Sequence, residues 1–405
     1  MPNQSTVAAA PFAAEEVARL RADTPGCDHV VHFNHCGSSL MPRPVIDATI
    51  GHIEREAAIG GYEAADEADD RVEAVYASTA RLVGAEPDEI ALVENATRGW
   101  DMAFYAIPLQ AGDRILTSVA EYGSNALAFL HVAERGVSVE VVPNDEHGQI
   151  DTEALARLLD DRVRVVALSH MPTNGGLLQP AAAVGRLARE AGAIVLLDAC
   201  QTAGQLPLDV DELGCDILSA TSRKFLRGPR GMGFLYVRRE LCERLHPPFV
   251  DIRAATWTGP DTYDLVPGAR RFENWESNVA GKLGMGAAIA YALDLGLDRI
   301  WATVFERAAT LRERLAAIPG VTVRDLGAVK GGIVTFDVAG VPADDVRDVL
   351  HRDRINTTVS GITSTRWDMT ERGLRRLNRA SVHYLTTDGE IDALVGGVAR
   401  LASVR

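Results

Sequence analysis

The sequence predicts an α/β fold in which helices flank a mostly parallel β-sheet, followed by a smaller α+β domain. From about residue 44, short β-rich runs alternate with helical periods, an order typical of parallel strands joined by helices. After Pro319 the pattern becomes α+β, and 405 residues suffice for two cores. We therefore expect a large domain over residues 31–280 and a small domain over 281–405. Residues 1–30 should form a segment that packs with the small domain.

The elements of the large domain follow from the spacing of apolar residues and from β-rich runs. Helical periodicity predicts helices over 45–57, 70–83, 96–104, 152–159 and 181–190. Short apolar runs predict strands over 89–93, 114–117, 137–142, 163–168, 193–198, 216–219 and 232–237. Ligands of such sheets bind beyond the carboxyl ends of the strands, so the residues at these ends are candidate site residues.

The later part of the chain is expected to contain long helices and a few short strands. The predicted helices cover 280–295, 300–315, 343–351 and 390–401, and the predicted strands cover 321–323 and 332–338. A group of arginines is interpreted as the solvated face of a helix: Arg372, Arg375 and Arg376.

Composition and charge limit the class of protein. The chain is 47% hydrophobic and 24% charged, as in ordinary globular proteins, and its net charge of −15 argues against nucleic acid or an anionic membrane as partner. The five cysteines are widely spaced without a CxxC pair, which favours reduced thiols over disulfides or a metal site. There is no signal-peptide pattern and no apolar stretch near the roughly 20 residues that span a bilayer. We expect a cytoplasmic protein without a metal.

The most informative residue is a lysine. The chain has three lysines, Lys224, Lys282 and Lys330, and Lys224 precedes the glycine-rich run 228–233. Upstream, a buried apolar run ends in Asp198. A lysine that forms a Schiff base and an acid that keeps a pyridine nitrogen protonated are what pyridoxal 5′-phosphate (PLP) requires. Lys224 and Asp198 are therefore the candidate catalytic residues, and PLP is the expected cofactor.

With these residues the chain resembles the class V aminotransferase and cysteine desulfurase family of fold-type I PLP-dependent enzymes, over about residues 33–401. The resemblance implies that Lys224 holds the cofactor and shuttles the Cα proton of the substrate. It places Asp198 at the pyridine nitrogen and Gln201 near the phenolic oxygen. Asn174 would touch the substrate or that same oxygen, although Asn-Gly pairs are also common in turns.

The resemblance also implies a phosphate site and a stacking residue. A helix that starts at Ala96 would offer free N–H groups to an anion, and a guanidinium can grip phosphate with two donors. Tyr122 aligns with the aromatic residue that stacks on the cofactor, where the family often has histidine; a buried core tyrosine is the alternative. The expected phosphate-binding residues are Ala96, Thr97, Arg98, Thr221 and Arg223.

The substrate is expected to bind through its α-carboxylate. Arg379 matches the arginine of the C-terminal domain that has this role in the family, and a guanidinium fork suits a carboxylate. Three further residues are expected to line the substrate pocket: Cys36, Gly37 and Tyr62. The segment 60–62 that contains Tyr62 could equally be a turn. Residues 271–278 align with a loop that reaches the phosphate of the neighbouring subunit, which implies a homodimer with a shared active site. Trp275 and Glu276 replace the usual Gly-Thr pair there, and a carboxylate would repel phosphate.

The type of reaction is narrowed by a missing cysteine. Cysteine desulfurases need a nucleophilic cysteine in the C-terminal domain, and this chain has none after Cys242, so we do not expect a persulfide-forming desulfurase. The motifs look most like those of C–S lyases in ergothioneine and lincosamide biosynthesis. We predict β-elimination from an S-substituted cysteine or its sulfoxide, with release of pyruvate and ammonia. An aminotransferase or a decarboxylating oxidative deaminase remains the alternative.

Overall fold

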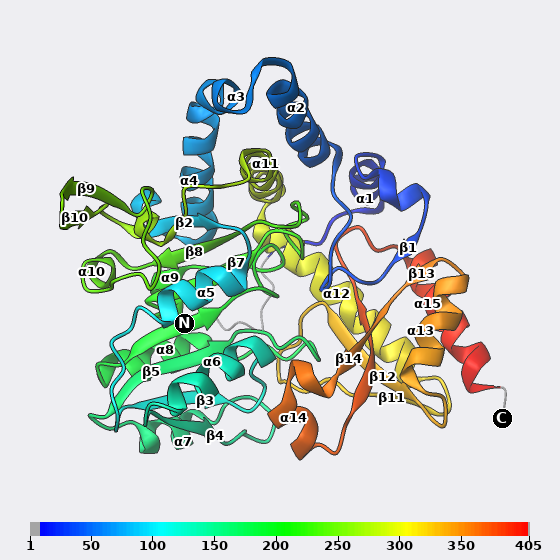
Figure 1. Ribbon diagram of the computed structural model, residues 1–405. Helices are drawn as coiled ribbons and strands as arrows, with labels where there is room; N and C mark the ends of the chain where they lie inside the picture. The colour runs from blue at the N-terminus through cyan, green and yellow to red at the C-terminus, as the bar shows by residue number, and fades with distance from the viewer. Residues whose placement is uncertain (1–8, 404–405) are drawn as a thin grey trace.

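The computed structural model describes residues 9–403, and a seven-stranded sheet forms the centre of the N-terminal part (Figure 1). Strands β7, β6, β5, β3 and β4 are parallel, whereas β8 runs antiparallel to both of its neighbours. The loop between β7 and β8 is too short for a crossover helix, so β8 has to return antiparallel. The predicted fold class, a mostly parallel sheet with flanking helices, is confirmed. In sheet order the strands are β2 (Ile90–Val93), β8 (Gly233–Val237), β7 (Ile217–Thr221), β6 (Ile194–Asp198), β5 (Val163–Ser169), β3 (Arg114–Ser118) and β4 (Ser138–Val142).

The sheet is buried on both faces. On β5, Val165 and Ala167 belong to one hydrophobic cluster, whereas Val166 and Leu168 belong to the other. Successive side chains of a strand point to opposite faces, so both faces are covered by apolar contacts, as parallel sheets require. The helices that follow the strands of this sheet are α5 (Ala96–Phe104), α6 (Gly123–Ala133), α7 (Thr152–Leu158), α8 (Ala181–Glu190), α9 (Val210–Leu213) and α10 (Arg239–Cys242).

The C-terminal part folds around a four-stranded antiparallel sheet. Its order is β11-β12-β15-β14, and β12 pairs with β15 in the register Thr335↔Arg379. The strands are β11 (Val321–Val323), β12 (Ile333–Val338), β14 (Thr358–Gly361) and β15 (Arg376–Ser381). The accompanying helices are α12 (Leu297–Ala316), α13 (Ala343–Arg352), α14 (Arg366–Glu371) and α15 (Asp388–Ala402).

The N-terminal segment contacts the C-terminal part of the chain. Helix α1 (Ala14–Ala22) carries Arg21, which forms an ion pair of 2.8 Å with Glu390, and the backbone N–H of Phe12 donates to Thr303 Oγ1 at 2.9 Å. Strand β1 (Val31–His32) pairs with β13 (Ile355–Asn356). Residues 1–8, which belong to the expected N-terminal segment, lie outside the described residues.

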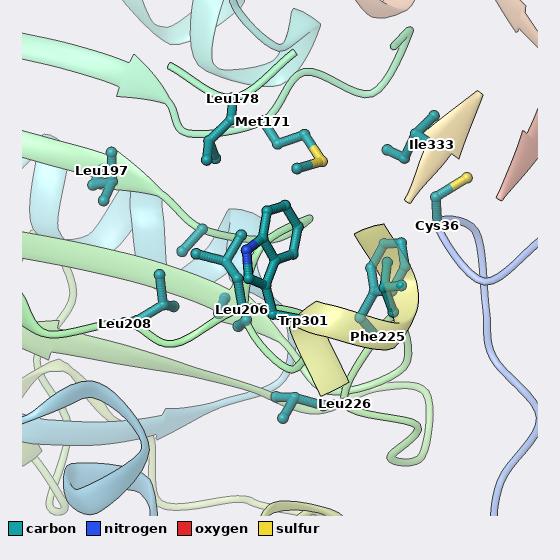
Figure 2. Close-up of a cluster of buried hydrophobic side chains, with 14 of the residues drawn as sticks. Cys36, Met171, Leu178, Leu197, Leu206, Leu208, Phe225, Leu226, Trp301 and Ile333 are labelled. Carbon is teal, nitrogen blue, oxygen red and sulfur yellow. The ribbon is translucent and has the colours of Figure 1, made fainter. Parts of the chain in front are cut away.

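A shared core joins these parts (Figure 2). Trp301 of α12 points into a cluster that includes Leu197 of β6 and Ile333 of β12. Phe225 and Leu226, which directly follow Lys224, are buried in the same cluster. The burial of these two side chains in the core fixes the loop that carries Lys224. Core packing therefore holds the backbone of the lysine in place.

The upper extension in Figure 1 consists of three helices beside the long helix α11 (Val279–Leu295), which lies between the first and the last of them. They are α2 (Arg43–Ile59), α3 (Gly61–Glu67) and α4 (Asp69–Val83). A hairpin of β9 (Ala255–Gly259) and β10 (Thr262–Leu265) projects nearby. Within residues 9–403, no helix combines the length and the apolarity needed to cross a membrane.

One sequence interpretation is wrong. Arg372 is the C-cap residue of α14, Arg375 lies in the following turn and Arg376 begins β15, so these arginines do not share a helix face. The segment 376–381 contains no β-branched residue, which hides its strand character. Its hydrogen bonds to β12 on one side and β14 on the other impose the strand.

Candidate active site

The carboxyl ends of five strands converge on a partly open pocket with a cavity volume of about 90 Å³. This is where ligands bind in parallel α/β sheets. The pocket combines residues that follow β2, β3, β5, β6 and β7. Eight of the sequence-predicted site residues line it: Ala96, Thr97, Tyr122, Asp198, Gln201, Thr221, Arg223 and Lys224.

Lys224 and Asp198 come from neighbouring strands. Asp198 is the last residue of β6 and pairs in register with Ser219 of β7, five residues before the lysine. The Asp198 carboxylate accepts hydrogen bonds from Cys200 N at 2.9 Å and from Asn125 Nδ2 at 3.1 Å. Burial lowers the pKa of Lys224, while the Cys200 thiol and the Asp198 carboxylate act in the opposite direction. A lowered pKa favours the neutral amine, the form that attacks a carbonyl and accepts a proton.

The start of helix α5 forms one wall of the pocket. Asn95 is its N-cap, and the Asn95 side chain accepts a hydrogen bond from Arg98 N at 2.9 Å. Ala96 and Thr97 are in the first turn and line the pocket. An α-helix carries partial positive charge at this end, so the wall favours an anion such as phosphate.

The donor and acceptor groups fit PLP. Within the described part of the chain, the buried atoms Gln201 Oε1 and Ser219 Oγ have no protein hydrogen-bond partner, although both residues line the pocket. Buried polar atoms rarely stay unpaired, which indicates a polar ligand. Asp198 provides an acid for a pyridine nitrogen, Lys224 an amine for an aldehyde and α5 an anion site, so each polar part of PLP meets a group of matching chemistry.

Four predicted site residues lie next to the pocket without lining it: Cys36, Gly37, Asn174 and Arg379. The first two contact lining residues through their backbone carbonyls. Arg223 donates to the carbonyl of Gly37, and Gln201 Nε2 donates to the carbonyl of Cys36 at 3.2 Å. Both carbonyls belong to the loop that follows β1, which therefore supports two pocket residues. The other two make contacts beside the pocket: Arg379 bonds to the lining residue Thr173, and Asn174 bonds to Asp368.

Side chains of the C-terminal part of the chain form hydrogen bonds with the turn at residues 173–174. Arg379 of β15 donates to both the carbonyl and the hydroxyl of Thr173, which lines the pocket. Asn174 Nδ2 donates to Asp368 Oδ2 at 2.6 Å, and this buried carboxylate also forms an ion pair of 3.1 Å with Arg372. Arg379 thus reaches the pocket rim, whereas the side chain of Asn174 is turned towards α14.

Two predicted residues lie away from the pocket of their own chain. The side chain of Tyr62 is 77% exposed on α3, in the upper extension of Figure 1. The guanidinium of Arg98 lies over the ring of Phe249 at 4.6 Å, and its backbone N–H is used by the Asn95 cap. Trp275 and Glu276, whose role the sequence left open, are exposed as well.

Sequence reasoning missed several lining residues. Asn95 could have been found, because an asparagine directly before a predicted helix is a capping signal. Asn125 carried no such signal, because its contact with Asp198 joins residues far apart in the chain. The remaining missed residues are Trp100, Ser169, Met171, Thr173, Cys200, Ser219 and Gly231.

The fold and the pocket define a fold-type I PLP-dependent enzyme. The sequence model of the family described as "Aminotransferase class-V" matches residues 31–394. The chain therefore belongs to the class V aminotransferase family, which is PLP-dependent.

Relatives match nearly the whole chain. A probable cysteine desulfurase from Synechocystis sp. is 31% identical over 383 residues, which cover 90% of this chain and 89% of that protein. A cysteine desulfurase from Salmonella gallinarum is 30% identical and covers 95% of this chain and 98% of its own length. The crystal structure of a cysteine desulfurase from Escherichia coli, in an S-sulfonic acid form, matches with a TM-score of 0.87 and 27% identity over 95% of this chain and 98% of that chain.

Proposed function

We propose that this enzyme cleaves the C–S bond of an S-substituted cysteine by β-elimination. One observation carries the proposal: the pocket combines the lysine and the acid that PLP requires, whereas residues 357–368, which bond through Asp368 to Asn174 next to the pocket, contain no cysteine. The bonds that break are Cα–H and Cβ–S, and the organic fragment hydrolyses to pyruvate and ammonia while the sulfur leaves as a thiol. The motif resemblance further favours a cysteine conjugate of a thiol natural-product pathway, in the cytoplasm.

The residues have distinct roles in this proposal. PLP, when bound, supplies the electron sink that stabilises negative charge at Cα. Lys224 removes the Cα proton, because burial lowers the pKa of its amine and so favours the neutral form that accepts a proton. The Asp198 carboxylate would stabilise the positive charge of a protonated pyridine nitrogen. Arg379 would orient the α-carboxylate of the substrate from the rim. Thr97, Thr221 and Arg223 would hold the phosphate, and Tyr122 would cover the ring.

A persulfide-forming cysteine desulfurase is the second candidate function, favoured by the relatives at 30–31% identity. Such an enzyme needs an accessible thiolate. Cys200 lines the pocket, but burial raises the pKa of its thiol, followed by the charge of Asp198. We therefore favour release of the sulfur as a free thiol.

The test is incubation of the PLP-loaded protein with a panel of S-conjugated cysteines, without a keto acid. Stoichiometric pyruvate and ammonia support the lyase. A cofactor spectrum that shifts to the amine form without pyruvate supports an aminotransferase, and consumption of oxygen supports an oxidative deaminase. Either of these two results overturns the proposal.

Turnover of cysteine itself is expected to leave no persulfide on the protein. The physical reason is that residues 357–368 contain no thiol and that burial raises the pKa of the Cys200 thiol. Intact-protein mass spectrometry after turnover measures this directly. An added sulfur on Cys200 or Cys36, located by peptide mapping, would instead establish the desulfurase.

Replacing Arg379 with alanine should raise KM for the substrate by about 10- to 100-fold, because a charge-assisted pair with the α-carboxylate is lost. The effect on kcat should be smaller. Arg375→Ala, at an exposed arginine nearby, is the control and should leave KM unchanged. Equal effects of the two variants would show that Arg379 has no specific role in binding the carboxylate.

We further propose a homodimer. Large apolar side chains are exposed on the segment that precedes the β9–β10 hairpin, on the hairpin itself and on α3, and a partner subunit would cover them. These side chains are Phe249, Ile252, Trp257, Tyr263 and Tyr62. In such a dimer Tyr62, Trp275 and Glu276 would be available to the partner's pocket. Sedimentation of the purified protein tests the oligomeric state.

A further inference from the structure

We propose that Glu121 is a positioning residue that orients Asp198 through the side chain of Asn125. Glu121 is only 1% exposed and lies directly behind two residues of the pocket wall, Tyr122 and Asn125. The inference rests on the assignment of PLP to this pocket. It does not depend on which substrate is cleaved.

The Glu121 carboxylate is saturated with hydrogen bonds. Its Oε1 accepts from Tyr122 N at 2.7 Å, from Asn125 Nδ2 at 2.9 Å and from the hydroxyl of Ser169. Its Oε2 accepts from Ser169 N at 3.1 Å and from Thr117 Oγ1 at 3.1 Å. Every partner is a donor, so only a group that accepts at both oxygens fits the position. A glutamine of the same shape would turn an NH2 group towards some of these donors.

The amide of Asn125 connects Glu121 to the catalytic acid. Asn125 Nδ2 lies 2.9 Å from Glu121 Oε1 and 3.1 Å from Asp198 Oδ2. An amide NH2 has two hydrogens, and here each of them meets a carboxylate. Glu121 therefore fixes which end of the amide faces Asp198. If the amide flipped, its oxygen would repel the carboxylate that it now supports.

The same network holds two groups that would contact the pyridine ring. Asp198 is fixed on one side by Asn125 and on the other by Cys200 N. Tyr122, on the pocket wall, is fixed by its own N–H to Glu121. Burial, followed by the proximity of Asp198, raises the pKa of Glu121, as expected for two carboxyl groups that share one amide.

The test is a double-mutant cycle on cofactor affinity, measured without substrate by the visible spectrum as PLP is added to the apoprotein. Glu121→Gln should weaken PLP binding about tenfold, the size of a lost hydrogen bond to a charged group. Asn125→Ala should weaken it by a similar factor. If Glu121 acts through Asn125, the double variant should bind no more weakly than the worse single variant. Additive losses, or unchanged affinity in Glu121→Gln, would overturn the proposal.

A buried carboxylate at the opposite end of the sheet is the matched control. Glu89 is 9% exposed at the start of β2 and accepts from Arg239 N at 2.9 Å, so Glu89→Gln should change stability without changing PLP affinity. If Glu121→Gln does not fold, Asn125→Ala alone decides, because it leaves the other four donors of Glu121 in place; unchanged PLP affinity then overturns the proposal. Failure of the lyase proposal is separately visible, since pyruvate would be absent while PLP binding stays intact.

Discussion

Lys224→Ala is expected to abolish turnover, with a loss of at least about 10⁴-fold, the upper end of what a positioned acid–base group contributes. The variant should also lose the visible absorption band that the lysine-linked cofactor gives to the protein. Both effects follow from removal of the only amine that lines the pocket within the described residues. Steady-state assays and an absorption spectrum of the purified variant measure them.

Lys330→Ala is the control for this prediction. Lys330 is half-buried, and its backbone forms an isolated bridge to Leu177 outside the pocket lining. Its loss should leave the spectrum and the turnover intact. Activity retained by Lys224→Ala would overturn the assignment of the site.

The second large effect is a loss of stability in acid. His170 is fully buried, and neither of its ring nitrogens has a partner in the part of the chain that the structure describes. Burial lowers the pKa of His170 to about 4, whereas an unfolded histidine titrates near 6.5. As the pH falls below about 6.5, His170 binds a proton in the unfolded chain but not in the native state. The free energy of unfolding therefore decreases until the pH reaches about 4.

The size of this effect is about 3 kcal/mol over that range, from His170 alone. Burial also lowers the pKa of His35 and His383, so they add in the same direction. Urea unfolding at a series of pH values measures the slope. His170→Gln, which cannot titrate, should flatten the slope, and His147→Gln, at an exposed histidine, should not. Equal slopes for His170→Gln and the parent protein would contradict the prediction.

The fold could be predicted because its signals are local. Apolar runs such as 193–198 and helical periods such as 181–190 stand at nearly the same residues in the structure. The strand at 376–381 could not be predicted, because its character comes from two neighbouring strands and not from its own composition.

The site divides in the same way. Lys224 and Asp198 could be predicted, because an amine and a carboxylate follow two apolar runs of the sequence. Both residues line the same pocket in the structure. The Glu121–Asn125–Asp198 network was not visible, because it links residues 73 positions apart through buried side chains. Tyr62 stays a prediction: its motif suggested a pocket residue, and its place on the exposed helix α3 could not be read from that motif.

The register of β6 has a consequence for how this enzyme can diversify. Val195 and Leu197 pack on one face of the sheet and Leu196 on the other, and Asp198 continues the same alternation. A slip of one residue would exchange the two faces and carry the acid away from the pocket. The position of the acid cannot drift without disruption of the core. New substrate ranges are therefore expected from substitutions outside this register, at residues 173–174 and in the cysteine-free segment 357–368.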